Sequence, residues 1–202
     1  MSYFYSALTS VGNVQEFAAA GSSWAGDRMK ELGATDFNAY QIIMGGEMSG
    51  MCLIGFEFDS IDAAMAGQAG LYQDAQMLEM MRDTQVSVVR RSLYRTQAEL
   101  GERKGQFGSV LYIAGRPIDD ATAASNLENS WKTVSEGANG VIGLQAVAAG
   151  ASPFQGTVVT ATDSLDALMS ASAKSFADPE MAKRMGEQGW TIIGRVLMNR
   201  LV

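Results

Sequence analysis

The sequence predicts an α+β protein in which two copies of one βαββαβ unit follow each other and close together as an α/β barrel. Three observations predict this fold. The chain matches itself at a constant offset of 104 positions, from Gly33 to Gly137 and onward. Each half shows the order strand, helix, strand, strand, helix, strand. A short polar stretch joins the halves.

The matches between the halves include residue types that composition explains poorly. Gly33-Ala34 aligns with Gly137-Ala138 and Asp59-Ser60 aligns with Asp163-Ser164. The same offset pairs glutamines, acids, methionines and arginines: Gln41 with Gln145, Asp74 with Asp178, Met77 with Met181, Arg91 with Arg195. The alternative is that two stretches rich in Ala, Gly and Met match by composition alone. The polar matches favour a true repeat.

The polar stretch QAELGERKGQ, Gln97 to Gln106, separates the two copies. Its glycines and charges are typical of a connection between domains. We therefore expect a first ferredoxin-like repeat over 1–97, a linker over 98–106 and a second repeat over 107–202.

Capping residues and apolar runs place the elements of each copy. Asn13 with Glu16 predicts a helix start, and Gly33 predicts its end. Asp119 and the pair Asp178-Pro179 predict helix starts in the second copy. The expected strands cover 3–11, 39–44, 51–58 and 85–94 in the first copy and 141–148, 157–162 and 191–201 in the second.

A βαββαβ unit forms a four-stranded antiparallel sheet with its helices on one face. The other face then needs a cover, and a second sheet of the same kind can provide it. We expect the two repeats to form an intramolecular dimeric arrangement. The protein would be a monomer with pseudo-twofold symmetry or a homodimer.

Composition excludes several classes of partner. A formal net charge of −7 disfavours nucleic acid and anionic membranes, which bind basic surfaces. The lone cysteine, Cys52, permits no internal disulfide, and the first residues lack the pattern of a signal peptide. We expect a cytoplasmic protein.

The sequence contains no histidine. The commonest general base, haem ligand and zinc ligand are therefore missing from the chain. We expect no cofactor and no metal.

The segments LGATDFNAYQIIMGGEMSGMCLIGFEFDSIDAAM and EGANGVIGLQAVAAGASPFQGTVVTATDSLDALM are each followed by a helix with the pattern Asp-x-x-Met. In these segments the chain resembles the dimeric α/β-barrel superfamily in a fused two-copy form. The pattern is most similar to the NIPSNAP and EthD-like branches. The superfamily includes cofactor-independent monooxygenases, cyclases, isomerases and haem enzymes, so the resemblance implies a fold more than a reaction.

Repeated polar residues on apolar strands are the first candidates for a site. Arg91 and Arg195 occupy equivalent places, as do Gln41 and Gln145. The functional interpretation is a pair of cations that hold an anionic or enolate-like ligand in the barrel, with the glutamines orienting it. The alternative is that each arginine pairs with an acid such as Glu57 or lies in solvent.

A cluster of aromatic residues occurs in the first copy only. Aromatic rings can hold a planar ligand by stacking, although ordinary packing also explains them. Trp24 and Arg28, four residues apart on one helix, are equally explained by a cation–π contact. The aromatic candidates are Tyr5, Trp24 and Tyr94 for ligand binding and Tyr40 as the catalytic acid or base, together with the arginines.

Two functions remain open. The first is a small-molecule enzyme without metal or haem: a monooxygenase, cyclase or isomerase acting on an aromatic or polyketide-like substrate. In this hypothesis Arg91 or Arg195 stabilises developing negative charge. The second is a non-catalytic binding or assembly scaffold.

Overall fold

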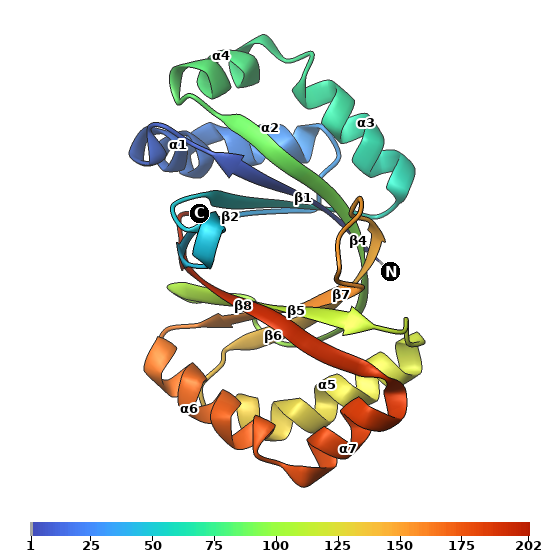
Figure 1. Ribbon diagram of the computed structural model, residues 1–202. Coiled ribbons are helices and arrows are strands. Elements are labelled where there is room, and N and C mark those ends of the chain that lie inside the picture. The colour runs from blue at the N-terminus through green and yellow to red at the C-terminus, as the bar shows by residue number, and fades with distance from the viewer. Residues whose placement is uncertain (1) are drawn as a thin grey trace. The chain divides into compact units, whose positions relative to one another are not determined.

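The computed structural model describes residues 2–202, which divide into two compact units. Unit 1 extends to Arg95 and also contains 147–149 and 200–202. Unit 2 contains 96–146 and 150–199. Figure 1 traces the chain through both units from the N-terminus to the C-terminus.

Unit 1 contains a four-stranded sheet and its helices. The strand order is β2-β3-β1-β4, and all neighbouring strands are antiparallel. In chain order the elements are β1 (Tyr3–Ser10), α1 (Val14–Ala20), a π-helical turn (Gly21–Ala25), α2 (Gly26–Glu31), β2 (Asp36–Met44), a 3-10 turn (Gly46–Met48), β3 (Cys52–Phe58), α3 (Ile61–Leu71), α4 (Ala75–Asp83) and β4 (Ser87–Gly101).

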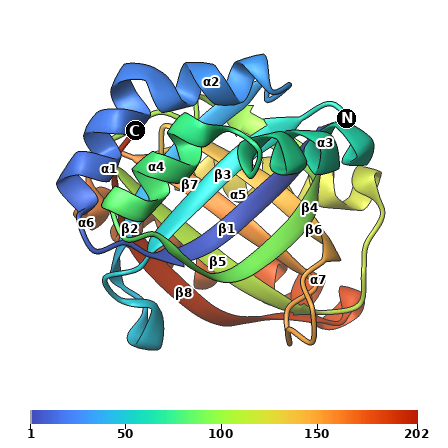
Figure 2. The ribbon, with the colours of Figure 1, turned by 90° about the horizontal axis from the view of Figure 1, so that it is seen from above.

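The helices of unit 1 all lie on one face of its sheet (Figures 1 and 2). Figure 2 looks past these helices onto β3, β1 and β4, which run side by side. The core between the two layers includes Phe17 and Met29 from the helices and Phe56 and Phe58 from β3. Gly67 on α3 lies against the Phe58 ring, and a β-carbon there would come within 2.6 Å of it.

Unit 2 has the same kind of sheet, with the order β6-β7-β5-β8 and antiparallel neighbours. Its helices also lie on one face of the sheet (Figure 1). The elements are β5 (Phe107–Gly115), α5 (Asp120–Val134), β6 (Gly140–Ala148), β7 (Gly156–Thr162), α6 (Leu165–Phe176), α7 (Pro179–Gln188) and β8 (Trp190–Arg200). The predicted α+β class and element order are confirmed in both units.

The predicted helix starts are confirmed by side-chain caps. The Asn13 side chain accepts a hydrogen bond from the Glu16 backbone N–H, and the Asp74 carboxylate accepts one from Met77. Asp178 caps α7 with Pro179 at its first position. These bonds satisfy amide groups that a helix start otherwise leaves unpaired.

The stretch expected as a linker, 98–106, is largely structured. Residues 98–101 continue β4 instead of leaving it. The following residues are bonded to unit 2: the Glu102 N–H donates to the Asn139 carbonyl, and the Asn139 amide donates to the Lys104 carbonyl. Backbone pairing, and not the glycines and charges of this stretch, decides where the strand ends.

The last residues of the chain belong to unit 1. The N–H groups of Leu201 and Val202 donate to the Ala39 carbonyl of β2. The Arg200 guanidinium lies 5.9 Å from the centre of the Tyr40 ring.

In residues 2–202, no helix combines the length and apolar character that crossing a bilayer demands.

We expect Cys52 to react slowly with a disulfide reagent in the folded protein. Its thiol is buried, and burial raises its pKa to about 11, so the reactive thiolate is scarce near neutral pH. Thiol titration should find it unreactive in buffer and fully reactive in guanidinium chloride.

The same shift predicts a loss of stability in alkali. The folded pKa lies above the unfolded value, so the thiol's contribution is complete below the unfolded pKa and is lost as the pH rises toward about 11. Rapid labelling of the folded protein at neutral pH would contradict this description of Cys52.

Candidate functional site

Unit 2 contains a cavity of about 150 Å³ between its sheet and its helices. All four strands and the three helices of the unit contribute to the lining. Most of the wall is apolar and includes Leu111, Leu127, Val158 and Leu168. A ligand was expected in the barrel interior, whereas this cavity lies between one sheet and its own helices.

Hydroxyl groups interrupt the apolar wall. Ser109, Thr160, Ser172 and Ser175 line the cavity, and all four residues are buried. Within residues 2–202 none of these side chains has a hydrogen-bond partner. Their oxygens are not among the buried unpaired polar atoms of the described residues, so they are accessible to a ligand or to water.

Arg195 brings a charge to the same cavity. Its guanidinium comes from β8, and its Nη1 donates to the Met169 Sδ at 3.0 Å. Its Cζ lies 5.4 Å from the centre of the Phe176 ring. Its Nε is buried and without a hydrogen-bond partner in the described chain, and no described carboxylate pairs with the group.

This environment is unfavourable for a cation by itself. Burial lowers the pKa of Arg195, although an arginine stays charged at neutral pH in any protein. A thioether is a weak acceptor, and a ring face attracts the cation only modestly. The Arg195 guanidinium therefore lacks the anionic partner that a buried charge usually has.

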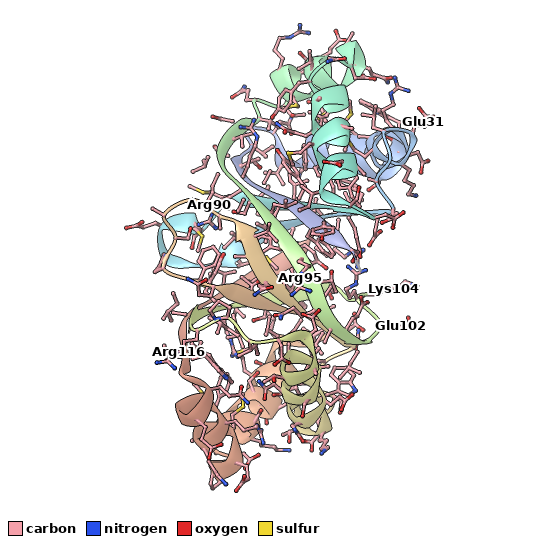
Figure 3. All side chains as sticks on the ribbon, turned by 90° about the vertical axis from the view of Figure 1, so that its right-hand side faces the viewer. Glu31, Arg90, Arg95, Glu102, Lys104 and Arg116 are labelled. Atoms are coloured by element: carbon pink, nitrogen blue, oxygen red, sulfur yellow. The ribbon has the colours of Figure 1, made fainter. Side chains whose placement is uncertain are left out.

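Two further arginines lie in this part of unit 2. Arg116 lines the cavity but is exposed, and Figure 3 shows its side chain pointing away from the unit. Arg184 on α7 does not line the cavity, and its Nη2 lies 3.9 Å from the Met181 Sδ. Arg195 is thus the partly buried cation of the cavity wall.

No described lining residue is an acid, a lysine, a cysteine or a tyrosine. Arg116 and Arg195 are its titratable groups, and neither serves as a proton acceptor near neutral pH. Within residues 2–202, no group of three or more Cys, Asp or Glu residues is arranged to hold a metal ion.

The matching space in unit 1 is only about 50 Å³. The difference follows from side-chain size at equivalent positions of the two halves. Where unit 1 places Tyr5, Phe56 and Leu71 in this layer, unit 2 places Ser109, Thr160 and Ser175. The cavity of unit 2 is the volume that these smaller side chains leave open.

The same differences between the units leave Arg195 without the phenol partners that its equivalent has in unit 1. In unit 1 the equivalent Arg91 donates to the Tyr72 hydroxyl at 2.5 Å and lies 5.3 Å from that ring's centre. The hydrogen bond to Tyr72 raises the pKa of Arg91, and a bond to Tyr5 adds to this. Unit 2 has Phe176 in place of Tyr72, so both phenol partners are gone.

Four of the predicted residues lie beside one of these two cavities or its arginine. Arg195 and Gln145 line the larger cavity, and Tyr5 lines the smaller one. Arg91 lies on the same sheet face as Tyr5 and bonds Tyr72. Glu57 pairs with Phe4 on the neighbouring strand, on the opposite face, so it is not the partner of Arg91.

The other predicted residues lie outside both cavities. Trp24 packs against the core of unit 1, and Gln41 donates to the Gly50 carbonyl at 3.4 Å. Tyr40 and Tyr94 project from the sheet face opposite to Tyr5. The structure therefore does not gather the aromatic candidates into one site.

Arg28 is held by two acids. Its Nε donates to Asp74 at 2.6 Å, and its Nη1 donates to Glu31 at 2.5 Å. These ion pairs account for Arg28, in place of the cation–π contact with Trp24 that its spacing suggested.

Sequence reasoning did not select the hydroxyl residues of the larger cavity. Each is an ordinary serine or threonine in an apolar element, with no pattern of its own. The available signal was the comparison of the halves, in which bulky residues of the first copy become small polar residues in the second. The aromatic candidates lie in the first copy, which has the smaller of the two cavities.

Solved structures similar to this chain share its fold. A "putative monooxygenase" from Fusobacterium nucleatum has a TM-score of 0.62 at 11% identity, covering 100% of this chain and 93% of that one. A heme-binding protein from Thermus thermophilus has a TM-score of 0.59 at 9% identity, covering 98% and 90%. An anthrone oxidase-like protein has a TM-score of 0.53 at 10% identity, covering 97% and 91%.

These neighbours have the dimeric α/β-barrel fold, and the chain is similar to them in fold. Identities this low show the fold alone. No protein-family model matches the chain, and no curated protein matches its sequence.

Haem, which one neighbour binds, does not fit the cavity of unit 2. The described lining has no histidine, cysteine or tyrosine to hold the iron. Its methionine, Met181, already faces Ser130 and Arg184 through its sulfur. The volume of about 150 Å³ is also below the range of pockets that enclose a molecule of that size.

We expect replacement of Arg195 by methionine to raise the free energy of unfolding by about 1 kcal/mol, because it removes a buried cation without an acid partner. The matched Arg91→Met variant should lower stability, because it breaks the bond to Tyr72. Urea unfolding of both variants measures the difference. Equal destabilisation by the two changes would contradict this account of Arg195.

Proposed function

We propose that unit 2 binds a small organic anion in the cavity between its sheet and its helices. Two observations on Arg195 carry the proposal: it lines the cavity, and its guanidinium has a buried, unpartnered Nε and no paired acid. A bound carboxylate or enolate would supply that acceptor, and charge-assisted hydrogen bonds of this kind are strong.

The composition of the wall supports the same function. Apolar side chains from both layers would bury the body of the ligand, while a few polar groups would fix its orientation. Gln145 lines the cavity from the same sheet as the arginine, which is consistent with the orienting role predicted for it. Tyr5, Trp24, Tyr40 and Tyr94 would have structural roles in unit 1.

Any catalysis at this site would be electrostatic. Arg195 would stabilise negative charge that develops on the substrate, as in an enolate. The lining has no acid or base to move a proton, so the substrate would have to lose its proton to water. A cofactor-independent monooxygenase, cyclase or isomerase acting on an acidic substrate fits this limit, and the names of two neighbours are compatible with it.

The alternative is a binding protein without catalysis. The missing acid and base favour it directly. Oxygen uptake and substrate turnover measured with the ligands that bind would separate the two functions.

The sequence also leads to proposals about the origin of the two units, the localisation of the protein and its oligomeric state. We propose that the two units descend from a duplicated repeat that closes as a barrel, most similar to the NIPSNAP and EthD-like branches. The order strand, helix, strand, strand, helix, strand, which both units share, supports this origin. We further propose a cytoplasmic protein, monomeric or homodimeric, without nucleic acid or membrane partners.

The test is binding of small organic acids and of their neutral amides, measured by thermal unfolding and calorimetry. We expect acids to bind about tenfold more tightly than the matching amides, because only the acids pair with Arg195. Arg195→Met should abolish this preference, and the control Arg91→Met should retain it. Since Arg195 stays charged, the pH dependence of binding should follow the pKa of the acid itself.

Equal binding of acids to the parent protein and to Arg195→Met would refute the proposal. The folded state of each variant is checked by its own unfolding transition.

A further inference from the structure

The volume of the cavity matches a ligand with one ring. An engineered apolar cavity of about 150 Å³ in another protein binds benzene. The cavity of unit 2 has the same volume, about 150 Å³. A single aromatic ring with small substituents fits this space, while fused rings of the polyketide kind exceed it.

The walls suit a flat body. Leu111 and Val158 line the cavity from the sheet, and Leu127 and Leu168 line it from the helices. Trp131 on α5 adds an aromatic surface to the lining. Apolar groups on two opposed layers favour a ring lying between them, where both of its faces are removed from water.

The charge of the wall specifies a single carboxylate. The free Nε–H of Arg195 and its neighbouring terminal nitrogen form a fork that matches the two oxygens of a carboxylate. Phe176 lies against the guanidinium and limits the approach to its edge. A second buried negative charge would find no partner, because the other lining arginine, Arg116, is exposed.

The unpaired hydroxyls point to polar substituents on the ring. Ser109, Thr160, Ser172 and Ser175 come from strands and from a helix, and none has a partner in residues 2–202. A benzoate without substituents would leave them buried and unsatisfied, whereas a ring hydroxyl both donates and accepts.

We infer that unit 2 binds a hydroxylated one-ring aromatic carboxylate, of the hydroxybenzoate class. The carboxylate pairs with Arg195, the ring lies between the two apolar layers, and the ring hydroxyl bonds one or two of the hydroxyl side chains of the wall. This inference rests on the proposed function and narrows it to one class of ligand.

Calorimetric titration of the full chain tests the inference with a defined panel. The panel is benzoate, its three monohydroxy isomers, benzamide, 2-naphthoate and phthalate. At least one hydroxybenzoate should bind about tenfold more tightly than benzoate, and benzoate more tightly than benzamide. Naphthoate and phthalate should bind at least tenfold more weakly than the best hydroxybenzoate.

Two variants test the position of the ring. Thr160→Phe restores the bulk that unit 1 has at Phe56 and should abolish binding. Thr191→Phe adds the same bulk at an exposed position outside the cavity and should leave binding unchanged. Ser109→Ala keeps the cavity open, and it should reduce the preference for a hydroxybenzoate over benzoate.

The outcomes separate this inference from the proposed function. Tight, Arg195-dependent binding of naphthoate would overturn the one-ring limit and leave the anion site in place. Equal affinity for benzoate and every hydroxybenzoate would overturn the role of the hydroxyls alone. If no acid in the panel binds, but longer aliphatic acids bind through Arg195, the aromatic class is wrong and the anion site stands.

Discussion

Packing between a sheet and the helices on one of its faces determines how much open volume each unit contains. An interior of this kind is normally filled to the density of an organic crystal, so a change in one bulky side chain alters the space around it. In unit 1, Tyr5 and Phe56 fill the layer. In unit 2, Ser109 and Thr160 do not, and the volume between sheet and helices stays open. The same architecture therefore leaves a small cavity in unit 1 and a larger one in unit 2.

The polar chemistry of the two units follows from the same substitutions. Tyr5 and Tyr72 occupy space in unit 1 and also satisfy Arg91. Where Ser109 and Phe176 replace them, the equivalent arginine loses two acceptors and the cavity opens beside it. The open volume and the unpaired charge therefore occur together in unit 2, whereas an ordinary packing defect would be apolar.

Much of the fold could be predicted from the sequence, because local chemistry specifies it. Asn13, Asp74 and Asp178 cap their helices through short-range bonds, and Gly33 ends its helix with φ of +97°. The strand β4 was harder to delimit, since a glycine at its end, Gly101, looks like the start of a connection. Its backbone pairing depends on contacts distant in sequence, which composition does not reveal.

The site could be predicted only in part. Arg195 and Gln145 were selected because polar residues on apolar strands are conspicuous, and both line the cavity. Tyr40 and Tyr94 were selected for their chemistry, but strand alternation directs them to the opposite sheet face from Tyr5. The direction of a side chain relative to the helices is a tertiary property, so residue type alone could not sort these candidates.

The boundary between the units falls inside strands, and this affects how the protein can be divided. Unit 2 includes 96–101 of β4, and the Gln97 side chain there donates to the Ile118 carbonyl and to Asp120. The last residue of β8, Arg200, and the two residues after it belong to unit 1. A fragment that begins at 107 would lack part of its own unit, and a first half that ends at 97 would lack its C-terminal partner for Ala39. The predicted repeat boundaries and the two compact units therefore divide the same chain at different residues.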